Sequence, residues 1–296
     1  MILISLLSKE GIKYKQNVDT AKISSIKAGG YAKIGLYPND THQIIKAIAI
    51  CKSIGVKYKI IGGCTNTYFS DNGYDGAVIF TSYLNSCRME DGYIAADCGC
   101  SLSRMLKFAA SHEFGIAGQL FGIPGSLGGA LRNNAGAYGK EISDVFLDGM
   151  FLDQQNLKIL HFGNKDLHFS YRYSDLQKNG LIFLGGRFKT CKLSKEKCAA
   201  EFSEYARKRR ETQPSAPSLG SFFKRRESII PAKLIDDANL KGHSIGGAGI
   251  SPIHAGFIVN IGNATADDIN NLAVYVENVI KSKFGEMLLR EAEFVD

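Results

Sequence analysis

Hydrophobic and polar residues follow two different periods along the first part of the chain. Residues 32–37, 56–61 and 77–81 are short apolar runs of the length expected for buried strands. Between the first two runs, apolar residues recur every three or four positions from Ile44 to Ile54, after the polar Asn39-Asp40-Thr41 and before Gly55. This spacing predicts an amphipathic helix with capping side chains at its start and a glycine at its end. The pattern therefore predicts a small α/β unit up to about residue 80.

The middle of the chain continues with strands and helices in a different order. The pattern predicts strands at 93–97, 145–152, 158–162 and 181–189, a helix at 102–112 and a charged helix at 195–210. A long glycine-rich segment separates the first helix from the second strand. These elements favour a second domain of the α+β class.

The last part of the chain begins with an irregular segment and ends in a further set of elements. Residues 212–224 contain two prolines and a glycine and predict a linker, although the linker ends in Gly-Ser-Phe-Phe. After it we expect a short helix at 232–239, strands at 244–247 and 255–261, and a helix from 265 or 266 whose apolar stripe faces a core. A last strand is expected at 287–295 and carries Glu291.

Two glycine clusters are the most informative signal for a bound ligand in this sequence. Residues 121–139 contain six glycines, a proline and two asparagines, and residues 62–66 (Gly-Gly-Cys-Thr-Asn) follow an apolar run. Glycine-rich turns bring backbone N–H groups close to phosphates, so two such turns suit a ligand with two phosphates. Neither cluster has the Lys-Ser/Thr pair of a P-loop or the GxGxxG pattern of a nicotinamide site. The alternative is that the glycines only form tight turns.

Composition excludes several other classes of protein. The 296 residues are 45% hydrophobic and 22% charged, as in folded globular proteins, and are long enough for two or three domains. The net charge of +7 is spread along the chain, and its densest run, residues 207–210, has glutamates around it. A solvated helix end or binding of a small anion explains this run, and no nucleic-acid-binding signature accompanies it.

The cysteines, histidines and N-terminus bear on compartment and metal content. Seven scattered cysteines without a C-x-x-C pair fit reduced thiols, and six histidines show no ligand spacing, so we expect neither disulfides nor a protein-held metal. The apolar run 1–7 is too short for a membrane span and lacks the basic start of a signal peptide. We expect a cytoplasmic protein without membrane insertion, a nucleic-acid partner or an obligate protein partner.

In this order, the motifs resemble the UDP-N-acetylenolpyruvoylglucosamine reductase family over nearly the whole chain. Residues 62–66 resemble its Gly-x-Gly-Ser-Asn turn, 122–139 its long flavin loop, 169–174 its Tyr-Arg-x-Ser site, and 220–224 its Gly-Ser-x-Phe-Lys segment. Residues 233–242, 246–248 and 254–255 continue the match, and 290–292 stand where the family has Pro-Glu-Val. The chain is similar to the shorter members that lack an extra substrate-covering insertion.

The resemblance implies a fold, a domain organisation and a reaction. The fold is α+β (α/β), with a PCMH/VAO-like flavin cradle of two subdomains, 1–80 and 81–210, and a C-terminal α+β substrate-binding domain, 211–296, whose last strand can pack back on the flavin domain. The reaction is the NADPH-dependent reduction of UDP-N-acetylenolpyruvoylglucosamine to UDP-N-acetylmuramate through FAD in peptidoglycan precursor synthesis. FAD and NADPH are thus the expected cofactors, and a UDP-sugar is the expected substrate.

The resemblance also assigns roles to residues of this sequence. Arg172 suits the stabilisation of an enolate-like carboxylate, because its guanidinium is always charged and planar. Ser221 is the expected proton donor, and Glu291 is expected beside the same carboxylate as a hydrogen-bond donor. The residues expected to bind FAD are Gly62, Gly63, Cys64, Thr65, Asn66, Gly122, Ile123, Gly125, Ser126, Gly129, Asn134 and Ala135. Those expected to bind the UDP-sugar are Tyr171, Arg209, Arg210, Lys224 and Arg225.

Several positions depart from the family pattern. Thr65 replaces a serine, Cys64 a common glycine, and Asn133 a common methionine; Arg226 and Arg290 replace prolines. Arg290 is adjacent to Glu291 in sequence and could pair with it, against the role expected for Glu291. Two other readings remain: a different FAD-dependent oxidoreductase of the same fold, and a non-catalytic protein that binds flavin or a nucleotide sugar. The Tyr-Arg and Gly-Ser-Phe-Phe motifs disfavour the first, and the three expected catalytic residues together disfavour the second.

Overall fold

The computed structural model describes residues 2–226 and 229–296 and divides the chain into two compact units. Met1, the first residue of the N-terminal apolar run, lies outside the described residues. Unit 1 comprises residues 1–15, 34–63 and 76–209, and unit 2 comprises residues 16–33, 64–75 and 210–296. Strands β1 (Lys13–Asp19), β2 (Tyr31–Tyr37) and β5 (Tyr74–Phe80) each continue from one unit into the other. The predicted subdomain division at residues 80 and 210 stays a prediction.

Unit 1 begins with a sheet and helices that match the first predicted pattern. The sheet has the order β1-β2-β5-β3, in which β3 (Tyr58–Ile61) runs parallel to β5. Helix α3 (Thr41–Ser53) starts at Asp40, whose side chain accepts a hydrogen bond from the Gln43 amide at 2.7 Å, and Gly55 follows it with φ +68°. The predicted caps are thus confirmed. Helix α1 (Ile2–Lys9) packs against α3.

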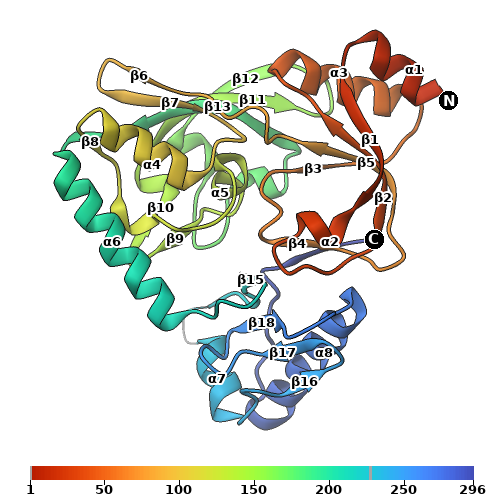
Figure 1. The fold of residues 1–296 in the computed structure, drawn as a ribbon, viewed down its shortest axis with the longest axis vertical. Helices are drawn as coiled ribbons and strands as arrows, with labels where there is room; N and C mark the ends of the chain where they lie inside the picture. The colour runs from red at the N-terminus through yellow and green to blue at the C-terminus, as the bar shows by residue number, and fades with distance from the viewer. Residues whose placement is uncertain (1, 227–228) are drawn as a thin grey trace. The chain divides into compact units, whose positions relative to one another are not determined.

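The second part of unit 1 is built on an antiparallel sheet of order β12-β11-β13-β7-β6 (Figure 1). Its strands are β6 (Cys87–Glu90), β7 (Tyr93–Asp97), β11 (Phe146–Asp153), β12 (Ile159–Gly163) and β13 (Leu181–Lys189). Its helices are α4 (Leu102–Ser111), α5 (Leu127–Arg132) and α6 (Lys195–Thr212), with 3-10 turns at Gly118–Leu120, Ile142–Asp144, Asn164–Leu167 and Asp175–Gln177. Two short strand pairs complete it: β8 (Phe114–Gly115) with β14 (Cys191–Lys192), and β9 (Gly136–Ala137) with β10 (Lys140–Glu141).

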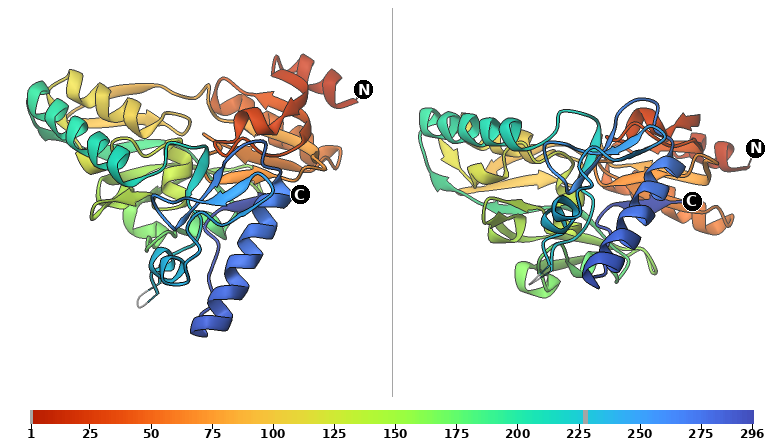
Figure 2. Two further views of the ribbon diagram at one scale, coloured as in Figure 1. Left: turned by 60° about the horizontal axis from the view of Figure 1, so that its bottom comes forward. Right: turned by 90° about the horizontal axis from the view of Figure 1, so that it is seen from below.

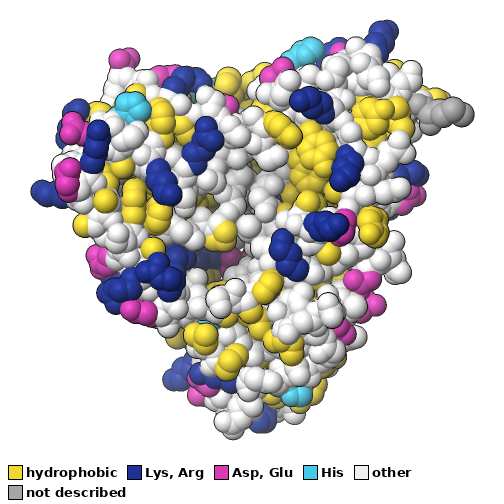
Figure 3. Space-filling view, viewed as in Figure 1, with side chains coloured by type: hydrophobic (Ala, Val, Ile, Leu, Met, Phe, Trp, Pro, Cys, Tyr) yellow, Lys and Arg dark blue, Asp and Glu magenta, His cyan; other side chains and the backbone are white. Residues whose placement is uncertain are grey.

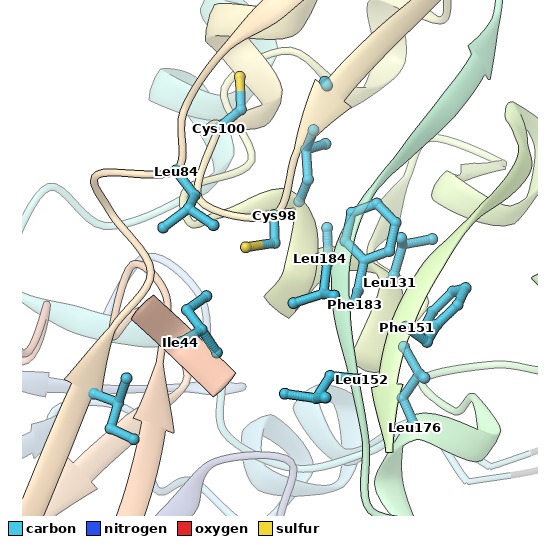
Figure 4. Packing of buried hydrophobic residues seen from close by; sticks show 14 of the residues in the cluster. Ile44, Leu84, Cys98, Cys100, Leu131, Phe151, Leu152, Leu176, Phe183 and Leu184 are labelled. Atoms are coloured by element: carbon cyan, nitrogen blue, oxygen red, sulfur yellow. The ribbon is translucent and has the colours of Figure 1, made fainter. Parts of the chain in front are cut away.

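One hydrophobic core fills unit 1. Phe151, Phe183 and Leu184 of the antiparallel sheet pack with Leu131 of α5, and the same cluster reaches Ile44 of α3 (Figure 4). All five side chains are at most 2% exposed. Since removing such side chains from water contributes about 1.5–3 kcal/mol each, this cluster holds the sheet and the glycine-rich segment that contains α5 in one body.

Unit 2 has its own sheet and its own core. Strands β15 (Ser218–Ser221), β18 (Phe257–Asn260), β17 (Ala248–Ile250) and β16 (Ser244–Ile245) form an antiparallel sheet in that order. The long helix α8 (Ala266–Phe284) contacts β16, β17 and α7 (Pro231–Asp237), and Figure 2 shows it from two further sides. A parallel pair of β4 (Thr67–Phe69) and β19 (Glu293–Val295) and the one-turn helix α2 (Thr20–Ile23) also belong to this unit.

Three expectations for unit 2 were wrong in detail. The expected linker contains strand β15, because Ser218 and Ser221 pair with Val259 and Phe257 of β18. The expected strand 244–247 is confirmed only for Ser244–Ile245, which form β16, because residues 246–247 form a tight turn before β17, where Gly246 has φ +53°. The expected strand 287–295 is reduced to β19 and an isolated pairing of Arg290 with Phe223, so Glu291 lies outside a regular strand.

Charged side chains are spread over the surface, as the sequence predicts. Figure 3 shows Lys and Arg side chains dispersed over one face with acidic side chains among them. Among the helices of the described residues, none has both the length and the apolar content to cross a membrane.

Candidate active site

The two glycines that begin the short cluster, Gly62 and Gly63, meet the long cluster within unit 1. A Cβ atom built on Gly63 would lie 2.7 Å from Gly125 Cα and 3.3 Å from Gly125 C, both of them backbone atoms. A Cβ on Gly62 would overlap the Ser126 hydroxyl. The short glycine turn (residues 62–66) therefore contacts the glycine-rich loop (residues 121–139) through backbone that only glycine permits. This close approach is the feature expected of a shared diphosphate cradle.

Helix α5 lies inside the glycine-rich loop, where the sequence pattern predicted no helix. The hydroxyl of Ser126 accepts a hydrogen bond from the Gly129 amide at 3.3 Å and so caps its first turn. The carbonyl oxygens of Cys98 and Cys100 accept from the amides of Gly128 and Leu127, each at 2.8 Å. The turn after β7 therefore fixes the start of α5. Gly129 is exposed there, and a Cβ on it would meet only the Ser126 hydroxyl at 3.6 Å, so its backbone is accessible to a ligand.

Asn134 joins the glycine-rich loop to the segment that carries Arg172. Its side chain is 1% exposed, and its amide nitrogen donates to Glu141 Oε2 at 2.7 Å and to the Ser170 carbonyl at 2.9 Å. Its oxygen accepts from the Ser143 amide at 3.3 Å. The side chain of Asn134 therefore forms its hydrogen bonds within the protein. Its expected contact with FAD stays a prediction, and that contact would have to come from the Asn134 backbone.

Arg172 lies against the glycine-rich loop in a strained backbone conformation. Its φ is +54°, and the Gln177 side chain donates to its carbonyl oxygen at 3.0 Å. Its Nη2 donates to the Gly136 carbonyl at 3.1 Å, and its guanidinium lies 4.8 Å from the centre of the exposed Tyr171 ring. A non-glycine residue with positive φ persists only where its surroundings hold it, and such residues cluster at functional sites.

The sequence pattern did not single out Gln177, which holds this segment. Its amide nitrogen also donates to the Arg132 carbonyl at 3.0 Å, as does the Ser174 hydroxyl at 3.0 Å. Both bonds fasten the segment to the end of α5. The signal that could have pointed to Gln177 is its place three residues after the end of the Tyr-Arg-x-Ser motif at Ser174, since nothing in its own pattern distinguishes it.

Arg209 supports the glycine-rich loop from α6. Its Nε donates to the Phe121 carbonyl at 3.1 Å, and its Nη2 lies 3.5 Å from the Gln119 carbonyl. Its guanidinium lies 5.4 Å from the Tyr138 ring centre, and burial lowers the pKa of Arg209. A partly desolvated cation gains from a nearby anion, so this position suits either a loop support or a diphosphate contact.

The chain segments that carry Ser221 and Glu291 pair with each other within unit 2. The Glu291 amide donates to the Phe222 carbonyl at 2.8 Å, and the Lys224 amide donates to the Leu289 carbonyl at 2.7 Å. The segment that carries Ser221 thus runs antiparallel to the segment that carries Glu291. Asn66 holds the second segment, because its side chain donates to the Glu291 carbonyl at 2.9 Å and its own carbonyl accepts from the Glu293 amide at 2.9 Å.

Arg290 has a partner on α8. Its Nε and Nη2 donate to the two carboxylate oxygens of Glu277 at 2.6 and 3.1 Å, and its Nη1 donates to Asn270 Oδ1 at 3.1 Å. The same Asn270 oxygen accepts from the buried Tyr68 hydroxyl at 2.7 Å. Because Glu277 already binds the Arg290 guanidinium through both carboxylate oxygens, Arg290 has less tendency to pair with the Glu291 side chain.

The remaining residues expected to bind FAD or the UDP-sugar differ mainly in their exposure. Cys64 is buried with φ +50°, which suits the glycine common in the family, and burial raises the pKa of its thiol to about 12. Gly122 is exposed with φ +81°, while Ile123, Ala135, Thr65 and Lys224 are half-buried. Arg210 and Arg225 are exposed, as a surface cation would be with or without a substrate.

Comparison with known proteins agrees with these motifs. A family model described as the C-terminal domain of UDP-N-acetylenolpyruvoylglucosamine reductase matches residues 213–295, and an FAD binding domain matches residues 32–155. A UDP-N-acetylenolpyruvoylglucosamine reductase of Caldicellulosiruptor saccharolyticus is 39% identical over 294 residues, which cover 98% of this chain and 94% of the relative.

Solved structures give the same result for the fold. The crystal structure of UDP-N-acetylenolpyruvylglucosamine reductase from Thermus caldophilus superposes with a TM-score of 0.80 at 25% identity, covering 96% of this chain and 99% of the other. A berberine bridge enzyme-like protein of Physcomitrella patens has a TM-score of 0.52 at 18% identity over 64% of this chain and 44% of its own, and it shows likeness of fold alone. The predicted α+β flavin-binding fold is confirmed. The chain belongs to the UDP-N-acetylenolpyruvoylglucosamine reductase family of FAD-dependent oxidoreductases.

Proposed function

We propose that this chain reduces the enolpyruvyl ether of UDP-N-acetylenolpyruvoylglucosamine to UDP-N-acetylmuramate, with NADPH as reductant, in peptidoglycan precursor synthesis. Its 39% identity to a reductase of that name over 98% of the chain supports this activity. The close backbone approach of Gly63 to Gly125 fits FAD, because a diphosphate needs N–H groups uncrowded by side chains. Gly62, Gly63, Gly125 and Ser126 would hold FAD, which would supply the hydride-transfer chemistry that links NADPH to the substrate.

Arg172 is proposed to bind the substrate carboxylate. Electron density on the carbon next to that carboxylate delocalises into it during reduction, and a preorganised cation stabilises this charge. The bonds of Arg172 to Gly136 and Gln177 support this role, since they fix the backbone and one edge of the guanidinium before substrate arrives. A fixed charge avoids reorganisation in the transition state.

Ser221 is proposed to donate the proton that ends the reaction, with Glu291 beside it. The observation that carries this assignment is the bond from the Glu291 amide to the Phe222 carbonyl, which brings the two segments side by side. A serine hydroxyl is a weak acid, so it gives up a proton only to a much more basic carbanion, and general acid catalysis of this kind contributes about 10²- to 10⁴-fold. Glu291 in its protonated form donates a hydrogen bond to the same carboxylate.

The UDP diphosphate is proposed to bind basic side chains. Arg209, Arg210, Lys224 and Arg225 are the candidates, with Tyr171 as a further contact. Arginine suits phosphate because its planar fork can donate two parallel hydrogen bonds. The proposed location is the cytoplasm, supported by the odd number of scattered cysteines.

Replacement of Ser221 by alanine tests the proposal. In anaerobic stopped-flow measurements, NADPH should bleach the FAD of Ser221→Ala at the rate of the unchanged protein, because Ser221 acts only on the substrate. Reoxidation by the enolpyruvyl substrate should slow by about 10²- to 10⁴-fold. Ser218→Ala is the matched control, since it removes a hydroxyl from the same strand, and its reoxidation rate should not change. Unchanged reoxidation in Ser221→Ala would show that another group donates the proton.

A further inference from the structure

Two of the seven free thiols lie in direct contact within unit 1. Cys87 Sγ and Cys100 Sγ are 3.0 Å apart. Cys87 is the first residue of β6 and lies opposite Ala96 of β7, and Cys100 lies in the turn that follows β7. Because a disulfide has an S–S distance of about 2.05 Å, the two sulfur atoms need to approach by only about 1 Å to bond.

The two thiols differ in their surroundings. Cys87 is half-buried, whereas Cys100 is 0% exposed. The hydrogen bond from the Cys100 thiol and, after it, the positive charge of Arg104 hold the pKa of Cys87 below its usual value. The same hydrogen bond and burial raise the pKa of Cys100. Reactive cysteines are accessible thiolates with a neighbouring thiol, so Cys87 is the attacking residue and Cys100 the resolving one.

Cys100 lies next to the expected flavin site. Its carbonyl oxygen accepts from the Leu127 amide, and its neighbour Ser101 forms a bridge with Ser126. In Figure 4 the sulfur of Cys98 points toward Leu84, while the sulfur of Cys100 points away from it. The Sγ–Sγ distance of 3.0 Å makes Cys100 the thiol of this turn that contacts Cys87, and a bond between them would tie β6 to the turn that fixes the start of α5.

We propose that Cys87 and Cys100 are a redox-active dithiol, a modification site at which a peroxide forms a disulfide between β6 and the turn that holds the glycine-rich loop. The Cys87 thiolate attacks one peroxide oxygen, the O–O bond breaks, and an alcohol or water leaves after taking a proton. The resulting sulfenic acid is attacked by the Cys100 sulfur, which breaks the S–O bond and releases water. The two thiols lose two electrons in total, and the peroxide gains them. A small dithiol reduces the disulfide back to the two thiols by exchange and is itself oxidised to a disulfide.

Peptide mapping of the peroxide-treated protein tests this proposal. The full-length, FAD-loaded protein is treated with hydrogen peroxide without NADPH, alkylated in denaturant and digested without reductant. The expected result is one peptide pair linked between Cys87 and Cys100, with the alkylated thiols reduced by two from seven and restored by dithiothreitol. Cys191→Ser, which removes an exposed thiol, should still form the link, and Cys87→Ser should not.

Other outcomes would overturn it. The proposal fails if Cys87 and Cys100 are both alkylated after peroxide treatment. It also fails if Cys87 is found as a sulfinic acid while Cys100 is alkylated, since Cys100 would then not resolve the intermediate. The mapping of the unsubstituted protein decides these outcomes, so the test does not depend on the folding of either variant.

Discussion

Replacement of Gly63 by alanine should separate the two glycine clusters. The Cβ of the new residue would lie 2.7 Å from Gly125 Cα and 3.3 Å from Gly125 C. Gly63 itself does not have a positive φ, so alanine is compatible with its backbone, and the effect is one of contact alone. Because both contacts are to backbone, no side chain can rotate out of the way.

The size of the effect follows from the overlap. Ordinary contact begins near 3.4 Å, so the short glycine turn and the glycine-rich loop would have to move apart by about 0.7 Å. Overpacking of this kind costs about 1–3 kcal/mol. If FAD requires the original spacing, its dissociation constant should rise by about 5- to 150-fold.

The assay is a titration of apoprotein with FAD, followed by the change in flavin fluorescence, with urea unfolding of the apoprotein alongside. Gly163→Ala is the matched control within unit 1, because its φ is −84° and its Cβ would meet Asp166 Oδ2 at 3.4 Å. The control should bind FAD as the unchanged protein does. If Gly63→Ala also has unchanged FAD affinity and unfolds at the same urea concentration, the two clusters do not form a cradle that depends on this contact.

Two further substitutions remove a side chain that holds local structure, one in unit 2 and one in unit 1. The carboxylate of Asp268 accepts from the Thr265 and Gly247 amides at 3.0 Å, and these bonds hold its pKa below the usual value. Its contribution to stability is thus present above the unfolded pKa of about 3.9 and is lost as pH falls through the lower folded pKa. Asp268→Asn should lower the urea-unfolding free energy by about 1 kcal/mol at neutral pH and by less in acid; an equal loss at both pH values would refute this reasoning. Arg209→Ala removes its contacts with the Phe121 and Gln119 carbonyls and should weaken FAD binding by about tenfold in the same titration. A change in the KM for the UDP-sugar alone would show instead that Arg209 serves only the substrate.

Much of the fold follows from local pattern. Strands β7 and β13 lie at the predicted residues, and α3 and α8 begin where capping side chains precede an apolar stripe. These elements could be predicted because periodicity and caps are local signals. Strand β1 was missed, since among its residues only Val18 is buried and its composition is polar. Helix α5 contains two glycines and depends on the Ser126 cap and the Cys98 and Cys100 carbonyls, which periodicity does not show.

The candidate active site also has one part that the sequence predicts and one part that only the structure shows. The motifs predicted Arg172 and Ser221 as catalytic residues, whereas the bond of the Glu291 amide to the Phe222 carbonyl joins segments about seventy positions apart and follows from tertiary pairing alone. Equally, the buried hydrogen bonds of Asn134 and the pairing of Arg290 with Glu277 depend on which groups folding brings together. Residue types thus indicated the chemistry, whereas partners and orientation required the structure.

The most direct measurement is an anaerobic visible spectrum of the purified, FAD-loaded protein during two additions. NADPH should bleach the yellow flavin, and one equivalent of the enolpyruvyl nucleotide sugar should restore the colour while UDP-N-acetylmuramate forms. UDP-N-acetylglucosamine, which lacks the enolpyruvyl group, should leave the flavin bleached. A flavin that NADPH bleaches but the enolpyruvyl substrate does not reoxidise would contradict the proposed function.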